Sequence, residues 1–131
     1  MSRVLAIANQ KGGVGKTTTT INLAASLSKL GQRVLVVDVD PQANLTSGVG
    51  QKGKSAEDGT IYDALTFPEP LTDVGPFTLS TSIERLDLVP ADQHLTGAEI
   101  ELVTLPHREE RLRKLLTSAR ARYDDILIDC P

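Results

Sequence analysis

The chain is poor in cysteine and in aromatic residues, and these shortages exclude several kinds of site. Cys130 is the single cysteine among 131 residues, so no internal disulfide can form and no cysteine cluster can hold zinc or an iron–sulfur centre. Phe, Tyr and Trp make up 3% of the residues. They are not interleaved with basic residues, as stacking on nucleic-acid bases would require. A reducing, intracellular setting follows from this use of cysteine.

Long apolar runs and an excess of positive charge are also missing. No stretch approaches the ~20 apolar residues of a membrane span, and Asn9, Gln10 and Lys11 interrupt the first apolar run before it reaches the length of a signal peptide. The net charge of −3 argues against a surface that coats nucleic acid. The size and the 40% hydrophobic content allow one domain with a core. We therefore expect a cytoplasmic protein without a membrane partner.

Short apolar runs predict buried strands that alternate with helices. The strands are expected at 4–8, 34–37, 86–89 and 126–129, with a weaker candidate at 77–80. Helices are expected at 16–30, 97–103 and 107–121, and Thr60 is expected to cap a short helix that ends at Leu65. Residues 46–60 are polar and rich in glycine, which predicts a mobile loop. This alternation predicts an α/β fold, with an open, mostly parallel sheet flanked by helices.

Two of the predicted helices have a recognisable apolar face. In 16–30 it consists of Leu23, Leu27 and Leu30, and Gly31 follows as the C-cap. In 107–121 the apolar stripe is Leu112, Leu115, Leu116 and Ala119. The other face of 107–121 is basic, with Arg108, Arg111, Arg113, Lys114 and Arg120. A solvated face is favoured over a nucleic-acid patch there, because two glutamates dilute the charge.

A glycine-rich turn follows the first predicted strand and has the composition of a phosphate-binding loop. Its sequence is Lys11-Gly12-Gly13-Val14-Gly15-Lys16-Thr17-Thr18. The three glycines permit positive φ and a close approach of backbone N–H groups to phosphate oxygens, and the helix that follows directs its positive end at them. In such a loop the last lysine reaches the terminal phosphates and the threonine after it can ligate Mg²⁺. The turn therefore predicts a nucleoside-phosphate site.

This loop departs from the common P-loop pattern at its start. Gln10 stands where the leading glycine of G-x-x-x-x-G-K-[ST] would be, and Lys11 adds a second cation beside it. The nearest alternative is a dinucleotide-binding fingerprint, because Gly13-Val14-Gly15 supplies G-x-G and Asp38 follows about 20 residues later. That alternative fails at Thr18, which replaces the third glycine, and it leaves the lysine and threonine at 16 and 17 without a role.

Three aspartates lie at the ends of predicted strands. Asp129 ends the last strand, as a Walker B carboxylate does when it binds Mg²⁺ through water. Asp38 and Asp40 lie two positions apart in an extended segment, and we expect their side chains to face opposite sides and not to share a role. One can face the phosphates while the other binds backbone or a magnesium-bound water; two turn residues ahead of Pro41 are the structural alternative.

Together these segments resemble the ParA/Soj ATPases, the deviant Walker A group that partitions bacterial chromosomes and plasmids. The matching runs are 8–18, 21–24, 38–44, 88–91, 97–102 and 126–131. The resemblance implies ATP and Mg²⁺ as cofactors, with residues 11–18 around the nucleotide. It also implies catalytic roles for Lys11, Lys16 and Asp40, and a metal site made by Thr17 and, through water, by Asp129. Lys11 would reach the nucleotide of a second subunit, and Gly12 would lie where the two loops approach.

The resemblance extends to partners and to the extent of the chain. Family members form a homodimer on binding ATP, bind DNA nonspecifically on the nucleoid and are stimulated by a ParB-type partner. The family continues past the Walker B proline, so residues 1–131 are expected to be the N-terminal portion of one ATPase domain. We expect this portion to encode the phosphate site, without DNA binding or ATPase activity of its own. A MinD-like membrane switch, an iron–sulfur carrier and a catalytically incompetent fragment are the alternatives.

Overall fold

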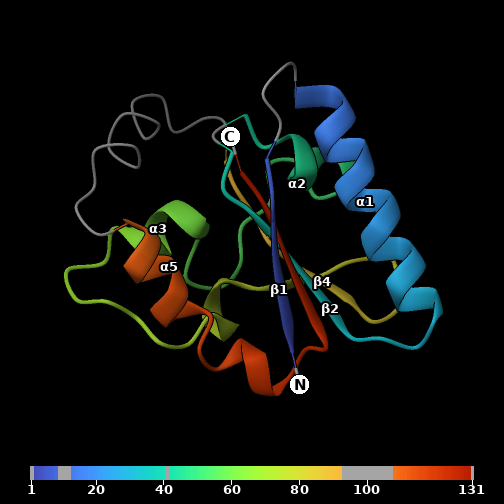
Figure 1. The fold of residues 1–131 in the computed structure, drawn as a ribbon. Coiled ribbons are helices and arrows are strands. Elements are labelled where there is room, and N and C mark those ends of the chain that lie inside the picture. Colours follow the sequence, from blue (N-terminus) through green and yellow to red (C-terminus); the bar gives the residue numbers. More distant parts are fainter. Residues whose placement is uncertain (1, 9–12, 41, 93–107, 131) are drawn as a thin grey trace.

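The computed structural model describes residues 2–8, 13–40, 42–92 and 108–130 as a layered α/β fold (Figure 1). The main elements in chain order are β1 (Arg3–Ile7), α1 (Gly13–Lys29), β2 (Val34–Asp38), α2 (Asn44–Gly48), α3 (Ile61–Leu65), β3 (Leu79–Ser80), β4 (Leu86–Val89), α5 (Arg108–Leu115) and β5 (Asp125–Asp129). The described strands form one sheet in the order β1-β5-β2-β4-β3. All neighbours are parallel except β3, which runs antiparallel to β4. The predicted fold class is confirmed.

The sheet separates two layers of helices. Helices α1 and α2 cover one face, here called the α1 face, and α3 and α5 cover the other, the α5 face (Figure 1). Alternate residues of each strand point to alternate faces, so Val34 and Val36 pack beneath α1 whereas Leu35 and Val37 pack beneath α5. All four are fully buried. The continuous apolar runs of β2, β4 and β5 are therefore those of strands covered on both faces. The prediction of a buried strand at 4–8 was wrong, because β1 lies at the edge of the described sheet and Leu5 is 41% exposed.

The register of the sheet brings two aspartates together at its carboxyl end. Asp38, the last residue of β2, is paired in register with Asp129, the last residue of β5. Both side chains are fully buried. They follow Val36 and Leu127 at alternate positions, so both lie on the α1 face. Open α/β sheets bind their ligands at this end of the strands.

Helix α1 confirms the predicted helix but differs from it in its start and its buried face. It begins at Gly13 rather than at residue 16. Leu30 is 77% exposed and Leu23 is 36% exposed, whereas Ala24 is fully buried. The predicted apolar face was right for Leu27, which packs against the core, and wrong for Leu23 and Leu30, because α1 otherwise approaches the sheet along small residues, which allow close packing. Gly31 has the expected C-cap conformation, with φ of 91°.

Other predicted segments were partly confirmed. Residues 46–60 are not a loop throughout: α2 extends to Gly48, and Thr46 is fully buried. The strand predicted at 77–80 is reduced to β3, which follows a 3-10 turn at Gly75–Phe77. The helix predicted at 107–121 is shorter, because α5 ends at Leu115 and is followed by a separate 3-10 turn at Ala119–Ala121. The helix predicted at 97–103 lies outside the described residues.

The short helix predicted after Thr60 is confirmed. Thr60 N–H donates to Asp63 Oδ2 at 2.8 Å and the two residues form a capping box at the start of α3. The apolar stripe of α5 is also confirmed, because Leu115 and Leu116 are buried against α3 and the sheet. None of the helices in the described ranges is long and apolar enough to cross a membrane.

Candidate phosphate-binding site

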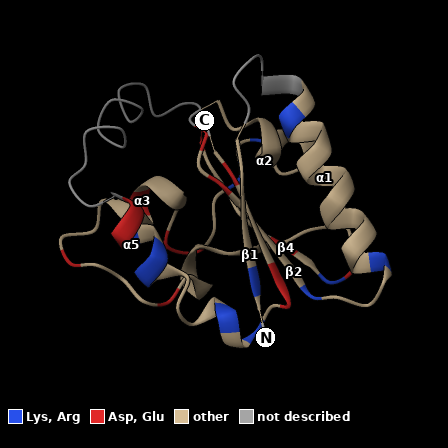
Figure 2. Ribbon diagram, in the orientation of Figure 1, with Lys and Arg blue, Asp and Glu red and all other residues tan. Residues whose placement is uncertain are grey.

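The first turns of α1 meet the carboxyl ends of β2 and β5 on the α1 face. Lys16 and Thr17 of α1 are buried there, with 5% and 7% of their surface exposed. In Figure 2, red acidic segments gather at the upper end of the sheet and a blue basic segment lies in the upper turns of α1. A buried lysine is rare unless it has a partner. This lysine has one in Asp129.

Asp129 is the centre of the site and receives hydrogen bonds from two predicted site residues. Lys16 Nζ donates to Asp129 Oδ1 at 2.8 Å and also to the carbonyl oxygen of Cys130. Thr17 Oγ1 donates to Asp129 Oδ2 at 3.3 Å. Residues that are more than a hundred positions apart in the sequence therefore meet around one buried carboxylate. The structure brings Lys16, Thr17 and Asp129 together, as a shared role would require.

Thr20 belongs to the same cluster, although the sequence analysis did not select it. Its Oγ1 lies 3.0 Å from the carbonyl oxygen of Lys16 and 3.3 Å from Asp129 Oδ1, so its single proton can be shared between the two acceptors. The side chain is fully buried. Its position one turn after Lys16 was the available signal, because residues four apart share a helix face.

Asp38 and Asp40 have different hydrogen-bond partners. Their spacing gives no reason to expect opposite sides, because residues two apart in an extended strand share a face. Asp38 Oδ1 accepts a hydrogen bond from the backbone N–H of Asp40 at 3.1 Å, and its Oδ2 accepts from Thr46. Asp40 Oδ1 accepts from the backbone N–H of Gln42 at 2.9 Å, and 8% of Asp40 is exposed. Both aspartates thus accept a backbone N–H, and the division of roles between them stays a prediction.

Burial has the largest effect on the pKa of Asp38. It raises the pKa of this carboxyl from 3.8 to about 6, against the opposing effect of the hydrogen bonds from Thr46 and Asp40. The charge of Asp129 adds to the increase in pKa. A carboxylate in this position is costly to charge, so its three donors must be well placed to keep it ionised at neutral pH.

The remaining predicted residues of the glycine-rich turn are placed unevenly. Lys11 and Gly12 lie outside the described residues, while Gly13 and Val14 form the first turn of α1. Gly15 lies within that helix and does not have the positive φ that we expected of it, because the helix has already begun. A Cβ on Gly15 would meet nothing within 4 Å. Thr18 is exposed.

The side chains in this cluster fit a magnesium-bound phosphate better than a metal held by protein alone. The described residues contain no group of three or more His, Cys, Asp and Glu that could bind a metal ion. They do offer one buried carboxylate and one hydroxyl, at Asp129 and Thr17, next to the ammonium of Lys16. Mg²⁺ is commonly held by one or two protein oxygens, with water and phosphate completing its shell. The set therefore suits a metal that arrives with a phosphate.

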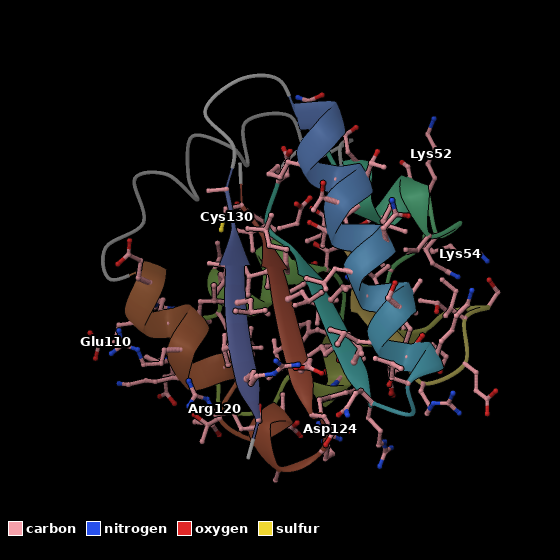
Figure 3. All side chains as sticks on the ribbon, turned by 45° about the vertical axis from the view of Figure 1, so that its right-hand side comes forward. Lys52, Lys54, Glu110, Arg120, Asp124 and Cys130 are labelled. Carbon is pink, nitrogen blue, oxygen red and sulfur yellow. The ribbon has the colours of Figure 1, made fainter. Side chains whose placement is uncertain are left out.

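A cavity on the α5 face is separate from this cluster. It has a volume of about 320 Å³ and lies between β1, β5 and α5, with Val4, Leu112, Leu116 and Ile128 in its wall. Lys16, Thr17 and Asp40 are not among its lining residues. Cys130 is, and Figure 3 shows it at the upper end of the sheet. The cavity wall is largely apolar, although Glu109, Arg113 and Arg120 also line it.

Comparisons with known proteins agree with a nucleotide site. A family model described as an AAA domain, AAA_31, matches residues 2–131. Sporulation initiation inhibitor protein Soj of Bacillus subtilis is 48% identical over 100% of this chain and 50% of its own length. Chromosome partitioning protein ParA of Myxococcus xanthus is 50% identical over 100% of this chain and 45% of its own length. The chain thus spans about half the length of the curated relatives it matches.

A solved structure of a similar protein contains a bound nucleotide analog and magnesium. Cobyrinic acid a,c-diamide synthase from Mycobacterium smegmatis, with bound ATP analog and magnesium, has a TM-score of 0.83 and 37% identity to this chain. The match covers 100% of this chain and 52% of that one. ParA/Soj partitioning proteins and an ATP-binding enzyme therefore share this fold with the chain.

Proposed function

Because the chain belongs to the AAA_31 family of AAA domains, we propose that it is the phosphate-binding part of a ParA/Soj-type partitioning ATPase. The observation that carries this proposal is the buried cluster in which Lys16 and Thr17 converge on Asp129. The relatives at 48% and 50% identity are partition and sporulation-control proteins, which supports the partitioning role. The cofactors proposed are ATP and Mg²⁺.

The residues of the turn divide the work of binding. Backbone N–H groups of residues 11–18 would cradle the phosphates, at the positive end of α1. In the ligand-free chain the ammonium of Lys16 lies 2.8 Å from the carboxylate of Asp129. On nucleotide binding it would leave this contact and bind the terminal phosphate oxygens. Thr17 would hold Mg²⁺ through its hydroxyl and Asp129 would hold it through water. Bound Mg²⁺ supplies neutralisation of phosphate charge.

Hydrolysis would depend on Asp40, which would position the attacking water molecule. Its carboxylate follows the end of β2 and remains 8% exposed, so it can orient a water molecule next to the phosphates. Phosphoryl transfer depends on such positioning and on charge stabilisation more than on covalent chemistry. Turnover would be slow and would act as a timer for the nucleotide-bound state.

Lys11 is assigned to a second copy of the protein. The second cation of the turn would contact the nucleotide of the partner subunit, and Gly12 would permit the close approach of the two loops. Lys11→Ala is therefore expected to lower ATP-dependent dimerisation, measured by sedimentation, more than it lowers nucleotide affinity of the monomer. Equal losses in the two measurements would remove the reason to place Lys11 across an interface.

The output of the switch is proposed to be nonspecific DNA binding on the nucleoid. A ParB-type partner would stimulate hydrolysis and release the DNA. In a protein as long as its relatives, ATP should promote retention of unrelated DNA sequences, and binding should weaken steeply with salt because phosphate contacts dominate it. Retention on anionic vesicles instead of DNA would favour the MinD-like alternative.

Turnover measured in two variants tests the assignment. In a protein of the relatives' length, Lys16→Ala should abolish both tight nucleotide binding and phosphate release, whereas Asp40→Ala should retain binding and lose phosphate release. Lys54→Ala is the matched control, because Lys54 is exposed and lies beyond α1 in Figure 3. Phosphate release that survives Lys16→Ala would exclude the site proposed here.

A further inference from the structure

Asp38 is a fully buried carboxylate to which the proposed function gives no role. It is paired in register with Asp129 at the end of the sheet, on the α1 face. A buried charge is unfavourable unless hydrogen bonds or an opposite charge compensate it. An apolar residue at such a strand end would therefore cost less free energy than an aspartate. The compensation here is specific: among the described residues, the hydrogen bonds to Asp38 come from the segment that carries Asp40 and from the helix after it.

One carboxylate holds both ends of the segment 40–46. Asp38 Oδ1 accepts the backbone N–H of Asp40 at 3.1 Å. Asp38 Oδ2 accepts two bonds from Thr46, at 2.9 Å from its backbone N–H and at 2.7 Å from its hydroxyl. The two oxygens thus bind residues six positions apart and close the segment over the end of β2.

Thr46 connects this segment to the chain beyond β4. Its Oγ1 accepts a hydrogen bond from the backbone N–H of Ala91 at 3.0 Å while it donates to Asp38. Both Thr46 and Ala91 are buried, so neither group has water as a substitute partner. The loops that follow β2 and β4 are therefore joined through one hydroxyl.

Within the described part of the chain, the hydrogen bonds that Asp40 accepts are local. Its carboxylate accepts from Gln42 and its carbonyl oxygen accepts from the N–H of Ala43, both within the same segment. These bonds move with the segment and cannot fix it to the sheet. The bond from Asp40 N–H to Asp38 does join it to the sheet, one residue beyond the bond from Val39 N–H to Asp129 O.

We infer that Asp38 is a positioning residue for hydrolysis, which sets the place of Asp40 through its backbone, and that Thr46 holds Asp38 and the loop after β4 in one arrangement. The inference rests on the proposed function, in which Asp40 orients the attacking water. Catalysis of this kind loses much of its rate when a group shifts by a fraction of an ångström to 1 Å. Asp38 therefore acts on turnover and leaves nucleotide binding to Lys16, Thr17 and Asp129.

Asp38→Asn tests the inference without changing the size of the side chain. An amide has one acceptor oxygen, so it cannot accept the bonds that reach both carboxylate oxygens. Amide hydrogen exchange of Asp40 should become at least tenfold faster in this variant, and kcat for phosphate release, measured in a protein of the relatives' length, should fall at least tenfold. The affinity for ATP with Mg²⁺ should stay within threefold. Asp125→Asn is the matched control, a buried aspartate at the opposite end of β5, and should leave exchange at Asp40 unchanged.

Thr46→Val and Thr46→Ser provide a second test that spares the charge of Asp38. Valine keeps the volume and removes the hydroxyl, so exchange at Ala91 should become at least tenfold faster and kcat should fall. Serine keeps the hydroxyl and should restore both to within threefold of the unchanged protein. Equal losses in the two variants would mean that Thr46 acts through packing alone, and would overturn its part in the inference.

Two outcomes would overturn the role of Asp38. Exchange at Asp40 that stays within twofold in Asp38→Asn would show that the carboxylate does not hold this backbone. An affinity for ATP with Mg²⁺ that falls at least tenfold in Asp38→Asn would show that Asp38 acts on nucleotide binding and not through the position of Asp40. If the unchanged protein of the relatives' length fails to bind or hydrolyse ATP, the proposed function fails, while the exchange measurements still decide whether Asp38 and Thr46 order the segment.

Discussion

The two faces of the sheet differ in what they bury. The α5 face is covered by large apolar side chains, with Leu65, Leu115 and Leu116 packed on Leu35 and Val37. On the α1 face, the carboxyl end of the sheet is covered by polar and small residues instead. Lys16, Thr17, Thr20, Asp38, Thr46 and Asp129 are all buried there.

This difference shows how one sheet serves two purposes. An apolar layer contributes about 25 cal/mol for each Å² that it removes from water, so the α5 face supplies stability. Buried ion pairs contribute little net stability, because desolvation offsets their attraction. The polar end of the α1 face is therefore better explained by ligand binding than by folding. Substitutions on the two faces should separate these roles.

Asp129→Ala is expected to have the largest effect on folding of the ligand-free chain. It leaves the Lys16 ammonium buried, with 3% of its side chain exposed and without its carboxylate partner. Breaking such a pair costs about 3–5 kcal/mol. Urea denaturation measures the loss. The double variant Lys16→Met, Asp129→Leu should lose clearly less than the sum of its single changes; additive losses would contradict a coupled pair.

Leu115→Ala, on the α5 face, should lower stability and leave the affinity for ATP unchanged. Leu115 is 1% exposed, and removing a buried leucine side chain costs about 2–5 kcal/mol in unfolding free energy. The affinity of the folded protein for ATP should stay within twofold, as measured at a temperature where the variant is folded. A tenfold loss of affinity in the folded variant would mean that the two faces are not separable.

The stability of the ligand-free chain should depend on pH through Asp38. The pKa of this carboxyl is raised to about 6 in the folded state, so its contribution is fully present below pH 3.8 and is lost as pH rises through 6. The difference between 3.8 and about 6 corresponds to about 3 kcal/mol. Urea midpoints of the unchanged chain and of Asp38→Asn should therefore diverge between pH 4 and pH 7. Parallel profiles would contradict the raised pKa.

The smallest effect is expected where the predicted leucine stripe of α1 was wrong. Leu30 is 77% exposed, so Leu30→Ser should change the unfolding free energy by less than about 0.5 kcal/mol. Leu27 is partly buried against the core of the α1 face, and Leu27→Ser is the matched control with an expected cost of about 1–2 kcal/mol. Thermal melts of the two variants make the comparison, and equal losses would restore the original stripe.

The sequence was sufficient for the fold class and for selecting the residues that meet at Asp129. Strands of continuous Val, Leu and Ile, joined by a glycine-rich turn and helices, limit the fold to a covered parallel sheet. The lysine and threonine at 16 and 17 and the aspartate at 129 were recognisable because each occupies a fixed place relative to a strand end or a helix start. Their meeting follows from parallel strands, whose carboxyl ends share one edge of the sheet.

Residues that act through long-range contacts could not be predicted. Thr46 lies in a segment whose composition is typical of a loop. Its burial depends on its hydrogen bonds with the carboxylate of Asp38, eight positions earlier, and with the N–H of Ala91. Thr20 is an ordinary helix residue until β5 brings Asp129 to it. The buried side of α1 was mispredicted for the same reason. Hydrophobicity alone predicts that leucines face the sheet, whereas small residues of α1 pack against it and let polar groups reach Asp129.

Binding of ATP with Mg²⁺ to the 131-residue chain, followed by calorimetric titration, is the measurement that tests the central claim most directly. The account predicts saturable one-to-one binding by the unchanged chain and by Lys54→Ala, and a loss of at least tenfold in affinity for Lys16→Ala, each shown by circular dichroism to be folded. Equal affinity in the folded Lys16→Ala variant would contradict it, because the nucleotide would then bind without the lysine that Asp129 holds at the start of α1.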